Sequence, residues 1–215
     1  MAAGEGGTAP SCYRKFRNSW ELCNKIQRFV HSINEPLRMV VDSYVIDVEI
    51  VKAAKQGDSD SFARVYDMIA PELYRVALYT LGNAQDAEDV VSETFVEAYK
   101  GIRNLRDESS FKRWMMTILS IRCKRRIGGY IKERKNVDID EMLDLPSDTG
   151  GVSEAERVSV WEAVKTLAPD EREIVMLATV QGYTTREVSE MLGIPHGTVS
   201  SKLHRTLKKL RKILE

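Results

Sequence analysis

The residues best suited to chemistry in this chain lie near its C-terminus, and the chemistry is recognition of phosphates and base edges. Between His196 and Glu215 there are six Lys or Arg residues against one acid. Cationic side chains along a helix attract phosphate, and polar side chains in its first turns can hydrogen-bond to bases in the major groove. The residues we expect to read duplex DNA are Thr184, Thr185, Arg186, His196, Thr198, Ser200, Ser201, Lys202, His204 and Arg205.

These side chains need a helix-turn-helix to position them, and the sequence carries the signals for one. Thr184 and Glu187 have the spacing of a capping box, which predicts the start of a short helix. Gly193 suits the left-handed residue that ends a helix, and Pro195 cannot continue one. The apolar residues that follow predict a long amphipathic helix carrying Val199, Leu203, Leu207, Leu210 and Leu214. An ordinary solvated basic helix is the alternative, and the capped helix and turn before it favour DNA.

A second basic stretch lies in the middle of the chain. The segment 122–135 holds seven Lys or Arg residues and one Glu. It continues a predicted helix that begins near Ser110 and has an apolar stripe of Phe111, Trp114, Ile118 and Ile121. Before it, another helix opens with acids around Asp86, whose charges suit a helix N-terminus. Taken alone, that acidic face is best interpreted as solvated surface.

Charge alternates along the chain although the formal net charge is zero. The two basic stretches are separated by 138–156, which holds seven acids and no base. Its Pro, Ser and Gly residues are typical of a linker. We therefore expect an all-α chain with two small helical domains, at 47–135 and 154–215, joined by a flexible acidic linker at 136–153. Four helices are enough to give the first domain a core of its own.

Helix boundaries in the first domain follow from capping residues. A short helix after Asp47 should end at Gly57, and a longer one capped by Asp58 should end at Gly82. Pro71 lies inside the longer helix and should kink it or restart it.

Composition excludes several classes of protein. Apolar runs are too short to span a bilayer, and charges interrupt the segment where a signal peptide would need an apolar core, so we expect a cytoplasmic protein without membrane insertion. Cys12, Cys23 and Cys123 have no metal-ligand spacing, so we expect neither a disulfide scaffold nor a metal site. Because the sequence shows no catalytic triad or phosphate-binding glycine loop, we expect no enzyme activity and no cofactor.

Five segments in register resemble one protein family. The segments 72–78, 86–95 and 109–114 are similar to region 2 of bacterial extracytoplasmic-function (ECF) sigma factors of RNA polymerase, and 167–173 and 192–199 are similar to region 4. Their order, their spacing and the acidic segment between them all match. The resemblance implies a subunit that binds core polymerase, reads the −10 and −35 promoter elements and has no catalytic centre of its own.

The resemblance assigns roles to matching positions. It implies that core polymerase binds one face of the acidic helix, at Asp86, Glu88, Asp89, Ser92 and Glu93. The loop after that helix would bind the unpaired −10 strand through Asn104, Arg106, Asp107, Ser109, Ser110 and Phe111. Side chains able to support that strand by stacking or phosphate contacts are Arg113, Trp114, Arg122, Lys124, Arg125 and Arg126. Trp114 lies on the apolar stripe, which favours a core role for it. The resemblance further implies that the helix-turn-helix residues bind the −35 element.

The resemblance also implies three partners: core RNA polymerase, promoter DNA and an anti-sigma factor. We expect the two domains of the free chain to be mobile, and to become compact when an anti-sigma factor inserts between them. A helix-turn-helix regulator that is not a polymerase subunit is the alternative, but it leaves the acidic helix without a role. Residues 1–38 match nothing in the family, and are either a regulatory extension or residues ahead of a true start at Met39.

Overall fold

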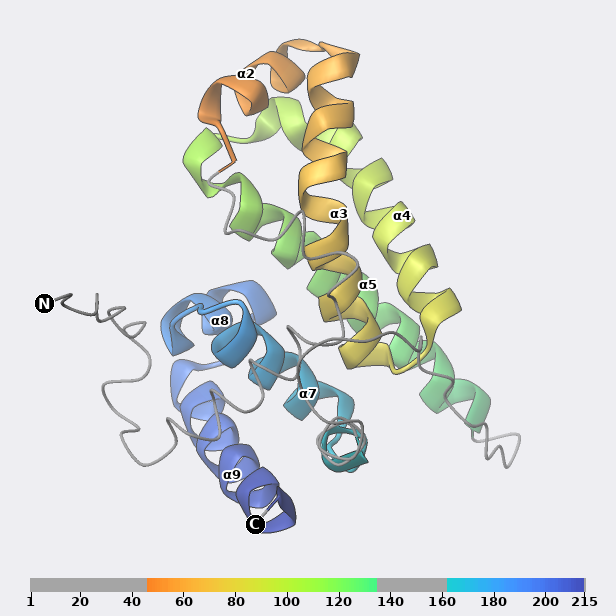
Figure 1. Ribbon diagram of the computed structural model, residues 1–215, viewed down its shortest axis with the longest axis vertical. Helices are drawn as coiled ribbons and strands as arrows, with labels where there is room; N and C mark the ends of the chain where they lie inside the picture. Colours follow the sequence, from red (N-terminus) through yellow and green to blue (C-terminus); the bar gives the residue numbers. More distant parts are fainter. Residues whose placement is uncertain (1–45, 135–161, 215) are drawn as a thin grey trace, which may run out of the picture.

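The structure is a computed structural model that describes residues 46–134 and 162–214. The N-terminal module consists of α2 (Val48–Gln56), α3 (Ser59–Leu81), α4 (Ala84–Gly101) and α5 (Phe111–Arg134), with 3₁₀ turns at Ile102–Asn104 and Glu108–Ser110. The C-terminal module contains α7 (Pro169–Val175), a π-helical segment (Met176–Val180), α8 (Thr185–Leu192) and α9 (His196–Leu214) (Figure 1). Every element in these two described parts is helical, as the sequence predicts. The expected N-terminal extension at 1–38 and linker at 136–153 lie outside them.

Helix ends in the N-terminal module lie where the sequence predicts them. Asp47 and Asp58 cap α2 and α3, and their carboxylates accept hydrogen bonds from first-turn amides at 2.9 and 3.2 Å. Both helices end at glycines in the left-handed conformation, Gly57 with φ 102° and Gly82 with φ 74°. Local signals in the sequence are therefore enough to set these boundaries.

The helix α3 runs without interruption through Pro71, so of the two outcomes expected there, a kink or a restart, the restart is wrong. A proline removes one backbone hydrogen bond from a helix interior. Ile69 and Leu73, on either side of it, are 1% and 0% exposed. Packing of both turns into the core therefore keeps the helix continuous.

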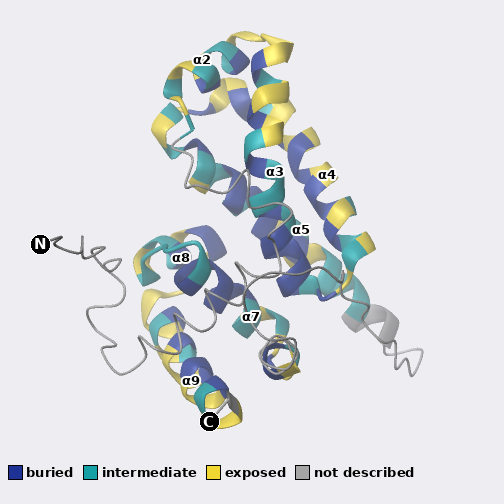
Figure 2. Ribbon diagram, viewed as in Figure 1, coloured by how far each residue is buried: buried dark blue, intermediate teal, exposed yellow. Residues whose placement is uncertain are grey.

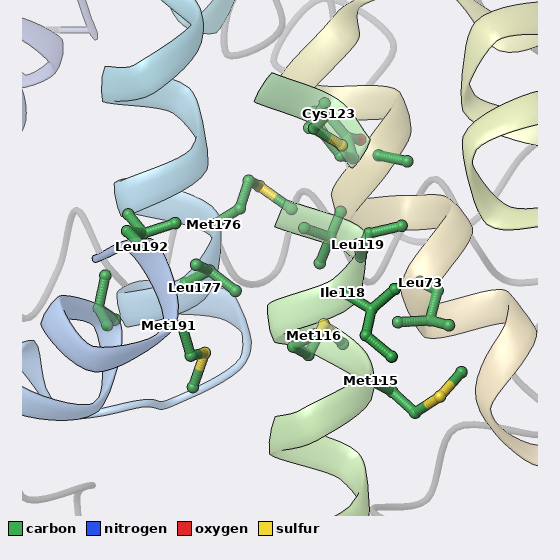
Figure 3. Close-up of a cluster of buried hydrophobic side chains, with 14 of the residues drawn as sticks. Leu73, Met115, Met116, Ile118, Leu119, Cys123, Met176, Leu177, Met191 and Leu192 are labelled. Carbon is green, nitrogen blue, oxygen red and sulfur yellow. The ribbon is translucent and has the colours of Figure 1, made fainter. Parts of the chain in front are cut away.

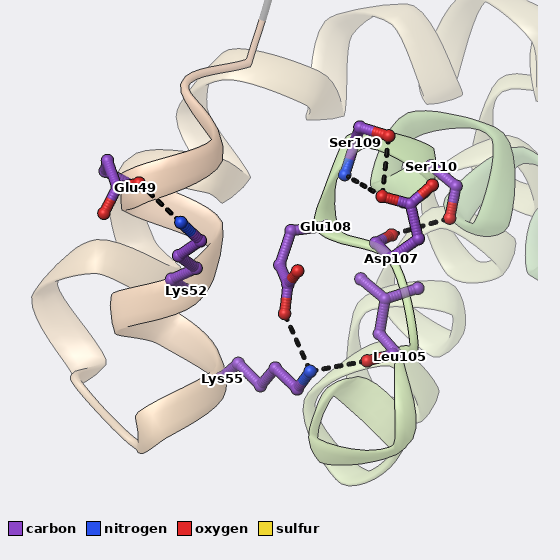
Figure 4. Close-up of polar contacts among 8 residues, drawn as sticks. All are labelled: Glu49, Lys52, Lys55, Leu105, Asp107, Glu108, Ser109 and Ser110. Atoms are coloured by element: carbon purple, nitrogen blue, oxygen red, sulfur yellow. Dashed lines mark hydrogen bonds and ion pairs between the residues drawn. The ribbon is translucent and has the colours of Figure 1, made fainter.

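In the N-terminal module α3, α4 and α5 pack together as a bundle, and α2 lies at one end of it (Figure 1). Lys55 attaches α2 to the loop before α5: its ammonium donates to the Leu105 carbonyl at 2.6 Å and to the Glu108 carboxylate at 2.7 Å (Figure 4). This hydrogen bonding lowers the pKa of Glu108. Within the described residues no helix has the length and apolar character needed to cross a membrane.

The C-terminal module contains the predicted helix-turn-helix. The Glu187 amide donates to the Thr184 hydroxyl at 3.2 Å, and the Thr184 amide donates to the Glu187 carboxylate at 2.8 Å, which confirms the capping box. Gly193 ends α8 with φ 63°. The apolar stripe of α9 is buried at Val199, Leu203, Leu207 and Leu210. The side chain of Leu214 lies outside the described part.

The two modules pack against each other, whereas the sequence led us to expect mobile domains with separate cores. The module interface includes Met116, Leu119 and Cys123 of α5 and Met176, Leu177, Met191 and Leu192 of the C-terminal module (Figure 3), and α3 also contacts α7 and the π-helical segment. Each of these side chains is buried. The difference arises because α5 has two apolar faces. One of them packs on α3, and the other needs a partner outside the bundle.

Candidate nucleic-acid interface

The helix α9 presents the polar and cationic face that the sequence assigns to duplex DNA. Because its apolar stripe is buried, the opposite side is exposed, and it carries His196, Thr198, Ser201, His204, Arg205 and Lys208 (Figure 2). The Thr185 hydroxyl lies 2.9 Å from Nε2 of His196, which joins the start of α8 to the start of α9. Arg186 is exposed on α8. Most of the residues expected to read the −35 element thus lie on two adjoining helices.

Three of the residues expected to read duplex DNA are less available. The Thr184 hydroxyl is engaged in the cap of α8. Ser200 is half-buried, and Lys202 forms an ion pair with Asp170 of α7. Arg205 remains exposed, with one hydrogen bond from its Nε to a carbonyl one turn earlier at 3.3 Å. Arg205 is therefore better placed than Lys202 to reach DNA.

Asp107 organises the loop before α5. Its carboxylate accepts hydrogen bonds from the Ser109 amide at 3.0 Å and the Ser109 hydroxyl at 2.7 Å, and its carbonyl accepts one from the Ser110 hydroxyl at 2.7 Å (Figure 4). The hydrogen bonds from Ser109 lower the pKa of Asp107. Phe111 is buried, which favours support of the loop over direct contact with a base. Exposed residues of the loop include Asn104, Arg106 and Ser109.

The apolar stripe expected on α5 differs from the sequence prediction at one end. Trp114 is half-buried and packs against the core, and a Cβ atom added at Gly101 would lie 3.3 Å from its ring, in agreement with the core role. Ile121 is 45% exposed, so its assignment to the stripe is wrong. Phe111 and Ile118 of the predicted stripe are buried, and so are Met115 and Met116, which the prediction left out.

The α5 cations expected to support the −10 strand have three kinds of surroundings. Lys124 donates to the carbonyl of Leu192, at the C-terminal end of α8, where positive charge complements the helix dipole. Arg113 lies 4.0 Å from Glu190, which is also on α8. Arg125 is exposed and forms no ion pair within the described residues. Arg122 and Arg126 point toward α4.

Arg126 contacts the acidic face of α4. Its guanidinium lies 2.7 Å from Asp86, 3.6 Å from Asp89 and 3.6 Å from Glu93. The Tyr130 hydroxyl donates to the same Asp86 carboxylate. Three of the carboxylates expected to bind core polymerase are thus partners of an arginine expected to support the −10 strand. Glu88 and Ser92, also expected to bind polymerase, are exposed on α4.

Arg122 extends these contacts by one turn, at 3.5 Å from Glu93 and 2.9 Å from Glu97. We call the set Asp86, Asp89, Glu93, Glu97, Arg122 and Arg126 the α4–α5 ion-pair network. Sequence reasoning missed Glu97. This residue lies four positions after Glu93, on the same side of α4, and Arg126 likewise lies four positions after Arg122 on α5. A cavity of about 460 Å³ borders the network and also touches Arg125 and Tyr130.

A buried carboxyl group lies where the two modules meet. Glu173 of α7 is 2% exposed, and its Oε1 has no hydrogen-bond partner within the described residues. Burial raises its pKa to about 7, against smaller lowering effects of Ser120 and Lys124 of α5. Burial also raises the pKa of Cys123 nearby. Sequence reasoning missed Glu173 because a glutamate in a charged segment carries no sign of burial.

Two family models match the chain in the order of the two modules. Sigma-70 region 2 matches residues 65–129, and Sigma-70, region 4 matches residues 157–210. The first match covers most of the α3–α5 bundle, and the second includes the helix-turn-helix.

Similar proteins agree with these matches. The ECF RNA polymerase sigma factor SigW of Bacillus subtilis is 30% identical over 177 residues, which cover 76% of this chain and 94% of SigW. The ECF RNA polymerase sigma factor BldN of Streptomyces coelicolor is 28% identical over 177 residues, which cover 78% of this chain and 65% of BldN.

Two solved structures share the fold. The sigma factor RpoE, crystallised with the anti-sigma factor NepR from Bartonella quintana, matches with a TM-score of 0.60 at 23% identity, over 72% of this chain and 97% of that one. CnrH, in complex with the cytosolic domain of CnrY, matches with a TM-score of 0.55 at 18% identity, over 79% and 97%. With two regions matched in order and a relative of 30% identity along most of its length, the chain belongs to the ECF family of RNA polymerase sigma factors.

Proposed function

We propose that this protein binds core RNA polymerase and directs it to promoters that carry a −10 and a −35 element. The observation that carries the proposal is the combination of both family regions, in order, with an exposed polar and cationic face on α9. The protein acts by binding and has no catalytic centre of its own. Because core polymerase and promoter DNA lie in the bacterial cytoplasm, the protein works there.

Each interface has its own place on the fold. The exposed face of α9 reads the −35 element, and Arg205 is its best-placed cation. The loop before α5 and the following turns of α5 bind the unpaired −10 strand, with Arg125 open to phosphate. The outer face of α4 binds core polymerase. Domain limits of 47–135 and 154–215 contain these three surfaces.

An anti-sigma factor is a further partner in this proposal. The support is that RpoE and CnrH, which share the fold, were each solved in complex with another protein, NepR and the cytosolic domain of CnrY. A protein that inserts between the modules would have to replace the contacts of the module interface. Such a partner would therefore present an apolar surface to residues such as Met116 and Leu192.

Run-off transcription tests the proposal. Core polymerase and the purified chain should together produce transcripts from a subset of a promoter library, and the selected promoters should share two elements at a fixed spacing. Core polymerase alone should not produce them. Binding to duplex DNA without association with core polymerase would instead support the helix-turn-helix regulator.

A further inference from the structure

The α4–α5 ion-pair network places two proposed binding surfaces in direct competition. Its carboxylates belong largely to the face proposed to bind core polymerase, and its arginines to the helix proposed to bind the −10 strand. Arg122 and Arg126 together contact four carboxylates of α4. While these contacts persist, the positive charge of both arginines is neutralised within the protein. The inference below rests on the proposed function and concerns how its two activities are linked.

We propose that core polymerase and the −10 strand exchange partners through this network. Basic side chains of core polymerase bind the α4 carboxylates, and the released Arg122 and Arg126 then bind phosphates of the unpaired −10 strand. Free protein would thus bind single strands weakly, and polymerase-bound protein would bind them more tightly.

Exposure of the side chains fits this order of events. Asp89, Glu93 and Glu97 are 47%, 49% and 52% exposed, so their outer oxygens are open to an approaching cation. Arg122, Arg126 and Asp86 are 20%, 29% and 16% exposed, so both arginines and Asp86 lie inside the three more exposed carboxylates. A partner approaching from solvent therefore meets negative charge first, which attracts a basic surface and repels phosphate.

The energetics and the space also allow an exchange. Ion pairs to the half-exposed carboxylates of Asp89, Glu93 and Glu97 are individually weak, so a basic partner can replace them at low cost, whereas the contact of Arg126 with Asp86 is the more sheltered one. The adjoining cavity of about 460 Å³ gives the arginine side chains room to move. Arg122, Arg125 and Arg126 lie on neighbouring turns of α5, and once Arg122 and Arg126 are released all three can contact one stretch of backbone phosphates.

The test uses the free full-length chain and a single-stranded DNA oligonucleotide of mixed sequence. Glu97→Gln removes one carboxylate partner of Arg122 at a position outside the proposed polymerase contacts. We expect the variant to bind the oligonucleotide about two- to fivefold more tightly than the parent in fluorescence anisotropy. Asp67→Asn is the matched control: it makes the same charge change at an exposed α3 residue that forms no ion pair within the described residues, and it should leave binding unchanged.

The same substitution made in a second variant shows whether Arg122 causes the gain in DNA binding. In Arg122→Gln protein, adding Glu97→Gln should produce no further gain, because the cation it would release is absent. In the complex with core polymerase, the difference between parent and Glu97→Gln should shrink, because polymerase has already engaged the neighbouring carboxylates.

Two results would overturn the exchange: a Glu97→Gln gain no larger than that of Asp67→Asn, or a gain that persists in the Arg122→Gln background. Failure of the proposed function has a different signature, since the parent chain would then not associate with core polymerase at all. The anisotropy measurement on the free chain does not depend on that association.

Discussion

At the scale of single residues, Glu173 is the side chain whose environment departs most from its sequence context. Its carboxyl group is enclosed between α7 and α5, and one of its oxygens lacks a hydrogen-bond partner within the described residues. A buried carboxylate is costly when it is ionised and much less costly when it is protonated. The module interface should therefore be more stable in mild acid than in mild base.

Glu173→Gln should remove that pH dependence. In the unfolded chain the carboxyl ionises near its ordinary pKa of 4.5, and in the folded chain near 7, so parental stability falls as pH rises between these values and then levels off. At pH 8 the variant should be more stable by up to roughly 3 kcal/mol, and near pH 4 the two should agree. Thermal unfolding at both pH values measures this. Glu162→Gln is the control, because the Glu162 side chain is 58% exposed. If both variants changed the thermal stability equally, the burial assigned to Glu173 would be contradicted.

At the scale of elements, α9 separates its cations by environment. Lys202 is tied to α7 through Asp170, whereas Arg205 is exposed. Arg205→Ala should weaken binding to a cognate −35 duplex by about 1–3 kcal/mol and change the base preference at one position, if its guanidinium contacts a base edge. Lys202→Ala should also lower thermal stability, because it leaves Asp170 without its partner. Titrations against a set of single-base variants distinguish these effects, and a uniform loss for Arg205→Ala would identify a phosphate contact.

The helix α4 has one face toward α5 and another toward solvent. Reversing Asp89 and Glu93 to Lys, the obvious test from sequence, would place new positive charge beside Arg126 and disturb the bundle. Glu88→Lys changes the solvent face alone, and we expect it to reduce co-purification with core polymerase several-fold at unchanged helical content. Asp67→Lys on α3 is the matched control. Full retention of polymerase by Glu88→Lys would exclude this face from the interface.

Element boundaries and element partners differ in how well the sequence predicts them. The caps at Asp47, Asp58 and Thr184 depend on residues a few positions apart, and all three were predictable. The direction in which Ile121 points was not, because α5 is buried on two sides and its apolar residues follow no single stripe. The α4–α5 network was missed for a related reason: its partners are far apart in sequence, and a charged residue gives no local sign of its partner.

At the scale of the whole molecule, the close packing of the two modules is the main departure from expectation. Met116→Lys should disrupt the module interface by placing a charge among buried methionines and leucines. We expect a larger radius of gyration in small-angle X-ray scattering with little change in helical content. Ile121→Lys, on the exposed side of the same helix, should leave the radius unchanged. A compact Met116→Lys protein with native helicity would show that the interface is not what joins the modules.

The contact of Lys124 with the end of α8 has a consequence for measured affinities. A cation that caps a carbonyl of the C-terminal module is not free for a DNA strand, so only molecules with separated modules can offer it. For a strand whose binding requires Lys124, the apparent dissociation constant equals the intrinsic one divided by the fraction of molecules in that separated state. If one molecule in about a hundred is separated, the affinity for such a strand measured on the free chain would be about a hundredfold too weak. Variants that shift this population would change DNA affinity without changing any residue that touches DNA.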